Sequence, residues 1–165
     1  MSLLWSYFWP LLAAGLAIGL LVGAFAFRGS RNRPVLATGL LVTLGAAALW
    51  HGPGGAAATF AARVERTARA SLDHYEMFQV QGQLQRAPLT RRLQLSGPAD
   101  DFQRSELVRL MSDLPGVTRA TWSATDRGLP LIVQGSLAAL AGYLFGAVLA
   151  YLVALRRRYN EQWSW

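Results

Sequence analysis

The sequence contains no cysteine and no lysine, and only 15% of its 165 residues are charged. The absence of cysteine excludes disulfide bonds, thiolate zinc sites and thiol nucleophiles. It also means that cysteine usage does not indicate whether the protein works in an oxidising or a reducing compartment. All 16 basic residues are arginine, and they produce a formal net charge of +7. These arginines lie in short clusters beside apolar runs rather than along one polar face. We therefore expect no nucleic-acid partner.

Charge is also missing from three long apolar segments. These are residues 1–27, whose apolar run starts at Leu3, residues 34–50 and residues 129–155. Because about 17–25 consecutive apolar residues cross the hydrocarbon core of a bilayer, we expect three transmembrane helices. A buried core helix is the alternative for the second and shortest segment. The first segment does not fit a cleavable signal peptide, since its apolar stretch is too long and no basic residue precedes it.

The positions of the arginines predict the orientation of these helices. Short arginine-rich segments stay on the cytoplasmic side, which applies to the linker 28–33 and to the tail 156–165. The N-terminus and the loop 51–128 then lie outside. A composition rich in Ala, Gly, Leu and Arg favours a bacterial protein, so we expect an inner (plasma) membrane protein with a periplasmic loop. Interfacial aromatic residues are expected on the outer side at Trp5, Trp9 and Trp50, and on the inner side at Tyr159, Trp163 and Trp165.

The loop 51–128 is long enough for a small α+β domain, with its core at residues 57–123. Its pattern predicts the order helix, strand, strand, helix, strand. The expected segments are 57–72, 78–84, 92–96, a helix capped by Asp100 or Asp101 and ended by Pro115-Gly116, and 117–122. The connection QRAPLTR (85–91), which includes a turn at Ala87-Pro88 and Thr90, is longer than a tight hairpin turn.

Three sets of apolar residues in this domain are predicted to face its core. Helical spacing selects the first and third sets, and strand alternation selects the second. They are Phe60, Val64, Ala68 and Leu72; Phe78, Val80, Gly82 and Leu84; and Phe102, Leu107, Leu110, Met111 and Leu114.

This order of elements, with LQLSG at 93–97 and LPGV at 114–117, resembles the BON domain. BON domains occur in bacterial envelope proteins, such as osmotically induced periplasmic proteins and some proteins of the outer-membrane-protein-A type. The most specific parts of the resemblance are Gly97, the intervening helix with Arg104 and Arg109, and Gly116-Val117. Gly97 and Gly116 both close an element where a positive φ is often needed. The resemblance implies a non-catalytic module that binds lipid or protein in the envelope.

Arginines flank the apolar stripe of the segment 57–72. Arg63, Arg66 and Arg69 are candidates for contact with lipid phosphate or with an acidic partner. The alternative is that they form the solvated side of the helix, near Glu65, Asp73 and Glu76.

Small residues form stripes on all three apolar segments. Such stripes let helix backbones approach closely in a membrane, so we expect helix packing there. The same stripes support a second hypothesis, a small accessory or assembly subunit of a larger respiratory or photosynthetic membrane complex, or a homo-oligomer. The glycines concerned are Gly15, Gly19, Gly23, Gly39, Gly135, Gly142 and Gly146.

The sequence offers little chemistry for an enzyme or a cofactor site. Ser71, Ser96 and His74 form no nucleophile motif, and no glycine loop for phosphate is present. His74 between acidic residues is a poor match to a metal site. His51 could ligate a haem or a chlorophyll-type pigment, but a histidine beside Trp50 is also typical of a membrane interface. We therefore expect a non-enzymatic protein without a cofactor.

Overall fold

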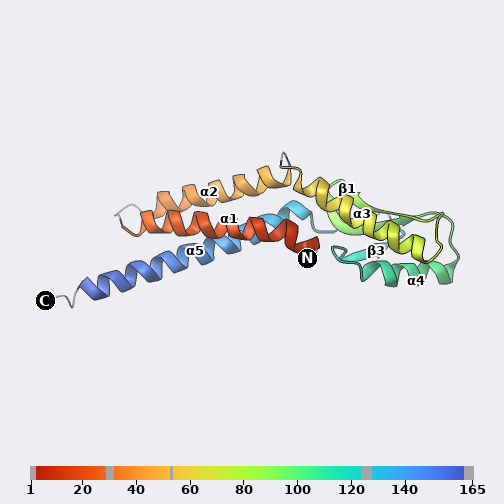
Figure 1. Cartoon of the computed structure of the whole chain (residues 1–165). Coiled ribbons are helices and arrows are strands. Elements are labelled where there is room, and N and C mark those ends of the chain that lie inside the picture. The colour runs from red at the N-terminus through yellow and green to blue at the C-terminus, as the bar shows by residue number, and fades with distance from the viewer. Residues whose placement is uncertain (1–2, 29–31, 53, 124–127, 162–165) are drawn as a thin grey trace. The chain divides into compact units, whose positions relative to one another are not determined.

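The computed structural model describes residues 3–28, 32–52, 54–123 and 128–161. The chain forms two compact units, which we describe separately. The helix bundle comprises Phe8–Gly54 and Gly135–Trp165, and the αβ domain comprises Met1–Tyr7 and Gly55–Gln134. The elements are α1 (Leu3–Ala26), α2 (Asn32–His51), α3 (Ala56–His74), β1 (Gln81–Arg86), β2 (Leu89–Ser96), α4 (Asp101–Ser112), β3 (Arg119–Thr121) and α5 (Leu131–Glu161) (Figure 1).

Three of these helices are long and apolar enough to cross a membrane. The stretches concerned are Leu4–Ala26 in α1, Arg33–His51 in α2 and Leu131–Asn160 in α5. The prediction of three long apolar helices is confirmed. The third is longer than expected, because Arg156–Arg158 continue the helix, as residues with good helix propensity do. Trp163 and Trp165, predicted at the inner interface, lie outside the described residues.

Within the bundle, α1 and α5 run parallel, and α2 runs antiparallel to α1. Gly15 lies against Ala139 and Gly23 lies against Ala150, so the residue numbers of α1 and α5 rise together along the contact. Helix α2 is joined to α5 by a hydrogen bond of 2.7 Å from Tyr143 Oη to the Leu36 carbonyl.

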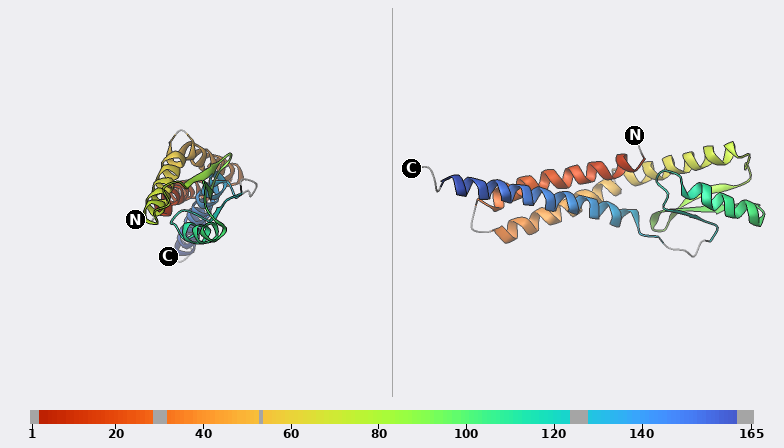
Figure 2. Two further views of the ribbon diagram at one scale, coloured as in Figure 1. Left: turned by 90° about the vertical axis from the view of Figure 1, so that its right-hand side faces the viewer. Right: turned by 90° about the horizontal axis from the view of Figure 1, so that it is seen from below.

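The αβ domain contains a three-stranded sheet in the order β1-β2-β3. Strands β1 and β2 are antiparallel, and β2 and β3 are parallel. The register aligns Leu84 with Leu93 and Leu93 with Ala120, so one buried apolar row crosses the sheet. Helix α3 contacts β1 and α4 contacts β3. Figure 2 shows both helices on one side of the sheet.

The core of the αβ domain contains the predicted helical stripe. Phe60, Val64, Ala68 and Leu72 are all buried along α3, which confirms the periodicity argument. Two further core residues come from α1 and α5. Tyr7 is buried with its ring centroid 5.7 Å from that of Phe60, and Leu131 is fully buried. The domain therefore completes its core with residues outside the predicted limits 57–123.

Two aromatic residues predicted to be buried are exposed. Phe78 is 66% exposed, because the chain is still turning there and β1 pairs only from Gln81 onward. Phe102 is 75% exposed. It precedes Leu107 by five residues, which places it about 140° away around the helix axis. Leu107 and Met111 are the buried residues of α4.

Leu110 and Leu114 were also expected in the core, but both are only half-buried. Together with Phe102, they show that the buried stripe of α4 is narrower than the sequence pattern indicates. Within the described chain, it consists of the i, i+4 pair Leu107 and Met111.

The hairpin is tighter than predicted. Arg86 pairs with Leu89, so the connection consists of Ala87 and Pro88, with a register shift between Leu84 and Arg86. Thr90, expected in the turn, is buried in β2. The expected long connection is wrong because both strands extend into it. Strand β3, in contrast, is shorter than the predicted 117–122.

The predicted cap and glycine turns are present. Asp100 caps α4, and its Oδ1 accepts a hydrogen bond of 2.7 Å from Gln103 N. The Gln103 side chain accepts one from Asp100 N in return, which completes a capping box. Gly97 and Gly116 have φ of 129° and 96°, a region that side chains disfavour. At Gly97, an added Cβ would also lie 2.5 Å from the Gln79 carbonyl oxygen.

Candidate functional site

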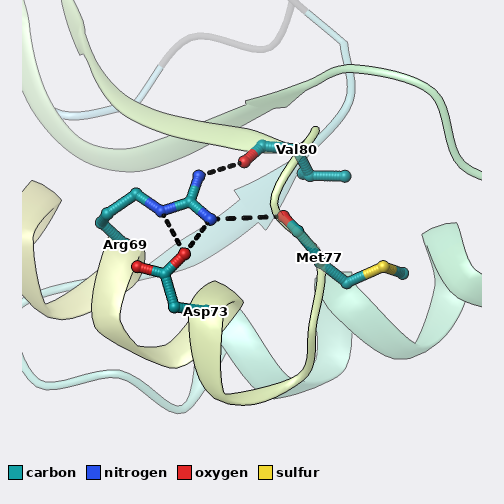
Figure 3. Close-up of polar contacts among 4 residues, drawn as sticks. All are labelled: Arg69, Asp73, Met77 and Val80. Atoms are coloured by element: carbon teal, nitrogen blue, oxygen red, sulfur yellow. Dashed lines mark hydrogen bonds and ion pairs between the residues drawn. The ribbon is translucent and has the colours of Figure 1, made fainter.

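Arg69, one of the predicted contact residues, fastens the end of α3 to the start of β1. Its guanidinium donates to Asp73 Oδ1 at 2.9 Å, to the Val80 carbonyl at 2.8 Å and to the Met77 carbonyl at 3.4 Å (Figure 3). The hydrogen bond from Arg69 holds the pKa of Asp73 below its usual value, and the same bond raises the pKa of Arg69. Arg69 therefore has a structural role in this domain.

Glu65, one turn earlier on α3, also connects this helix to β1. It accepts a hydrogen bond of 3.1 Å from Leu84 N and forms an ion pair of 2.8 Å with Arg86. Strand β1 is an edge strand, and unpaired main-chain donors at an edge invite pairing with other chains. Glu65 satisfies one such donor.

The sequence contained a signal for these roles. Glu65, Arg69 and Asp73 each follow a buried residue of α3, so they form a second line at i, i+4 and i+8 beside the apolar stripe. Charge alone groups Arg69 with Arg63 and Arg66, whereas its position along α3 places it on this second line.

Arg63 and Arg66 are exposed on another side of α3. They line a shallow depression with Thr67 and Ala70. Arg63 donates a hydrogen bond of 3.3 Å to Ser6 Oγ, and Arg66 donates one of 3.2 Å to the Ala62 carbonyl of its own helix. Only two of the three predicted arginines thus remain together on an accessible surface.

Arg91, which is not among the predicted site residues, is a further structural arginine. Its Nε donates to the Gly116 carbonyl at 3.0 Å, and its Nη1 donates to Gln134 Oε1 at 3.3 Å. Burial lowers the pKa of the Arg91 guanidinium. Arg91 thereby joins β2 to the turn before β3 and to the start of α5.

The face of the sheet opposite the buried row is polar. Gln83 pairs with Gln94, which in turn pairs with Thr121, so three hydrogen-bonding side chains cross the sheet side by side. Gln83 is exposed, while Gln94 and Thr121 are half-exposed. We call these three residues the polar row. Its amides and hydroxyl can both donate and accept hydrogen bonds, as a binding surface requires.

The glycine stripes of α1 and α5 face each other inside the bundle. A Cβ added at Gly15 would overlap the Ala139 carbonyl oxygen, and one added at Gly142 would overlap that of Leu12. Gly19 and Gly146 make equivalent contacts with carbonyl oxygens of the other helix, and Gly23 lies against the Ala150 side chain. Gly39 of α2 lies against Val22, and Gly135 is buried. The stripes are therefore occupied within the chain, and the accessory-subunit hypothesis loses them as a docking surface.

His51 ends α2 beside Trp50. An apolar cavity of about 560 Å³ lies next to Trp50 between α1, α2 and α5, and His51 is not among its lining residues. In the part of the chain that the structure describes, no three His, Cys, Asp or Glu residues are grouped as a metal site would require. Among the described residues, His51 belongs to no such group, and its role as a haem or pigment ligand stays a prediction.

No protein-family model matches the chain, and no curated protein and no solved structure gives a significant match to it.

Proposed function

We propose that this chain is a bacterial inner-membrane protein whose three apolar helices span the bilayer and present a BON-like domain to the periplasm. The domain acts as a non-catalytic module that binds or scaffolds a component of the cell envelope. The observation that carries the proposal is an αβ domain, of the kind found in water-soluble proteins, inserted in the chain between the apolar helices α2 and α5.

The directions of the helices support the membrane arrangement. Since α1 and α5 run parallel and α2 runs antiparallel to α1, the end of α2 and the start of α5 belong to the same side of the bundle. The chain can therefore leave the membrane after α2 and re-enter it at α5 on the same face, with the domain between them. The arginines at 28, 33 and 156–158 then lie on the opposite face, as the positive-inside rule requires of a cytoplasmic side.

The sheet topology supports the BON-like assignment. The α-β-β-α-β order of the resemblance corresponds to α3, β1, β2, α4 and β3. The two glycines of the resembling motifs, Gly97 and Gly116, occupy positive-φ turns at the ends of β2 and α4. The positive φ at Gly97 and Gly116 explains why glycine stands at these two positions of the motifs.

The polar row is the binding surface that the geometry favours. Helices α3 and α4 use the other face of the sheet for the core, which leaves Gln83, Gln94 and Thr121 for a partner. The side-chain amides of Gln83 and Gln94 and the hydroxyl of Thr121 offer directional hydrogen bonds to protein main chain or to polar lipid headgroups. Arg63 and Arg66, on α3, form a separate accessible surface.

Site-specific photo-crosslinking in living cells tests this proposal. A photoreactive amino acid at Gln83 is expected to capture a discrete envelope component, identified by mass spectrometry of the adduct. The same group at Arg66 controls for capture by any exposed residue of the domain. Equal adducts from both positions, or none from Gln83, would argue against the polar row as the binding surface.

A further inference from the structure

A pocket of about 470 Å³ lies between α1 and α5 at the end of the bundle that contains their C-termini. All of its lining residues belong to the bundle, and none of them lines the apolar cavity beside Trp50. Three arginines line it: Arg28, just after α1, and Arg157 and Arg158 on α5. No carboxylate is among its described lining residues.

The walls of this pocket repeat one pattern on both helices. Leu20, Ala24 and Arg28 follow each other at intervals of four residues, and so do Ala150, Ala154 and Arg158. On α5 this spacing places all three residues on the same face of the helix, and on α1 it places Leu20 and Ala24 on one face, with Arg28 in the turn that follows the helix. Each wall is therefore apolar along its length and cationic at its end.

The end of the pocket is held in place by specific contacts. Arg158 donates a hydrogen bond of 3.1 Å to the Phe27 carbonyl, where it also complements the negative end of the α1 dipole. The rings of Phe27 and Tyr151 pack edge to face with centroids 5.3 Å apart. These contacts hold the ends of α1 and α5 together, and Arg28 and Arg157 line the same pocket.

We propose that this pocket binds one anionic phospholipid of the inner leaflet. The phosphate lies against the guanidinium groups of Arg28 and Arg157, and an acyl chain runs along Ala24 and Ala154. Arginine forms paired, charge-assisted hydrogen bonds with phosphate, and basic pockets between membrane helices suit acidic headgroups. The proposal rests on the proposed function only in requiring that α1 and α5 span the membrane.

Lipid titration of the purified full-length chain tests this site. The protein in detergent is titrated with phosphatidylglycerol, phosphatidylcholine or water-soluble glycerol phosphate, and bound molecules are counted by native mass spectrometry. We expect one phosphatidylglycerol to bind in preference to phosphatidylcholine, and no comparable binding of glycerol phosphate. The double variant Arg28→Gln/Arg157→Gln is expected to weaken phosphatidylglycerol binding by about tenfold or more.

A matched variant separates the pocket from general charge. Arg33→Gln/Arg156→Gln removes two arginines from the same end of the bundle, and neither lines the pocket. We expect it to bind phosphatidylglycerol as the unmodified chain does. Ala154→Leu keeps every charge but fills the apolar wall, and it is expected to weaken binding too. Ala154→Leu keeps the test decisive if Arg28→Gln/Arg157→Gln fails to fold.

Three results would overturn the lipid site: equal loss in both double variants, equal binding of the two phospholipids, or glycerol phosphate binding as tightly as phosphatidylglycerol. The last would identify a site for free phosphate groups. Extraction of the chain from cell membranes by alkaline carbonate would instead contradict the proposed function. A membrane-integral chain without lipid preference would contradict the lipid site alone.

Discussion

The helix bundle and the αβ domain differ in where they place their large apolar side chains. At the closest contacts of the bundle lie glycines such as Gly15 and Gly142, while Leu21 and Phe25 are 63% and 69% exposed. In the αβ domain, Leu93 is fully buried and Gln83 is exposed. Water drives large apolar groups inward, whereas lipid supplies no such force and favours close backbone packing. The difference indicates that the two units suit different solvents.

Leucine at position 142 should break the bundle and produce the largest effect. The new side chain would overlap the main chain of α1 at Leu12, which cannot move without separating α1 from α5. We expect Gly142→Leu to destabilise the bundle by about 3 kcal/mol or more. Unfolding in detergent, followed by intrinsic tryptophan fluorescence, measures the change.

Gly45→Leu is the control for that experiment. Gly45 lies in α2, and a Cβ added there meets no atom within 4 Å. The expected change is within about 0.5 kcal/mol. If both variants lose stability equally, the packing of α1 against α5 through glycine is wrong.

Truncation of Leu93 should damage the αβ domain and leave the bundle folded. Leu93 lies on the central strand with partners in both neighbouring strands, so Leu93→Ala leaves a cavity in the core. We expect a loss of about 2–5 kcal/mol in the domain. Hydrogen exchange of β1 and β2 compared with α5 would locate it. Leu129→Ala, at an exposed leucine, is the matched control and should change little.

Removal of the α4 cap should have a moderate effect confined to the αβ domain. Asp100→Ala deletes the acceptor for Gln103 N, and the expected cost is about 1 kcal/mol. Asp101→Ala alters the neighbouring first-turn residue without removing the cap. Equal melting temperatures for the two variants would show that the capping box does not stabilise α4.

The smallest expected effect is the acid dependence contributed by Asp73. Because Arg69 depresses the pKa of Asp73 in the folded protein, the stabilisation is present above the ordinary carboxyl pKa, near 4. It is lost as the pH falls through the depressed folded value. Asp73→Asn should therefore reduce the drop in the melting temperature of the αβ domain between pH 5 and pH 2. An unchanged acid profile would contradict the linkage.

The sequence predicted those features that depend on local pattern. The three long apolar helices, the stripe from Phe60 to Leu72, the Asp100 cap and the glycine turns all follow from periodicity or backbone preference along one segment. These rules act within a few residues, so one sequence contains enough information to apply them.

Features that depend on pairing between segments could not be predicted in the same way. Phe78 was assigned to a strand by alternation, but the register with β2 decides where β1 begins. The role of Arg69 depends on the Val80 and Met77 carbonyls, which only the fold brings to it. Likewise, the contacts of Gly15 with α5 and of Gly142 with α1 can be predicted only if α1 and α5 are known to be neighbours.

The most direct test of the account is the sidedness of the αβ domain. Since the chain has no cysteine, single substitutions Gln83→Cys and Asn160→Cys provide unique labels. Spheroplasts of cells producing each variant are treated with a membrane-impermeant maleimide before and after permeabilisation. We predict that Gln83→Cys reacts in intact spheroplasts and that Asn160→Cys reacts only after permeabilisation. Labelling of Asn160→Cys in intact spheroplasts, or protection of Gln83→Cys, would contradict a periplasmic domain on a three-span anchor.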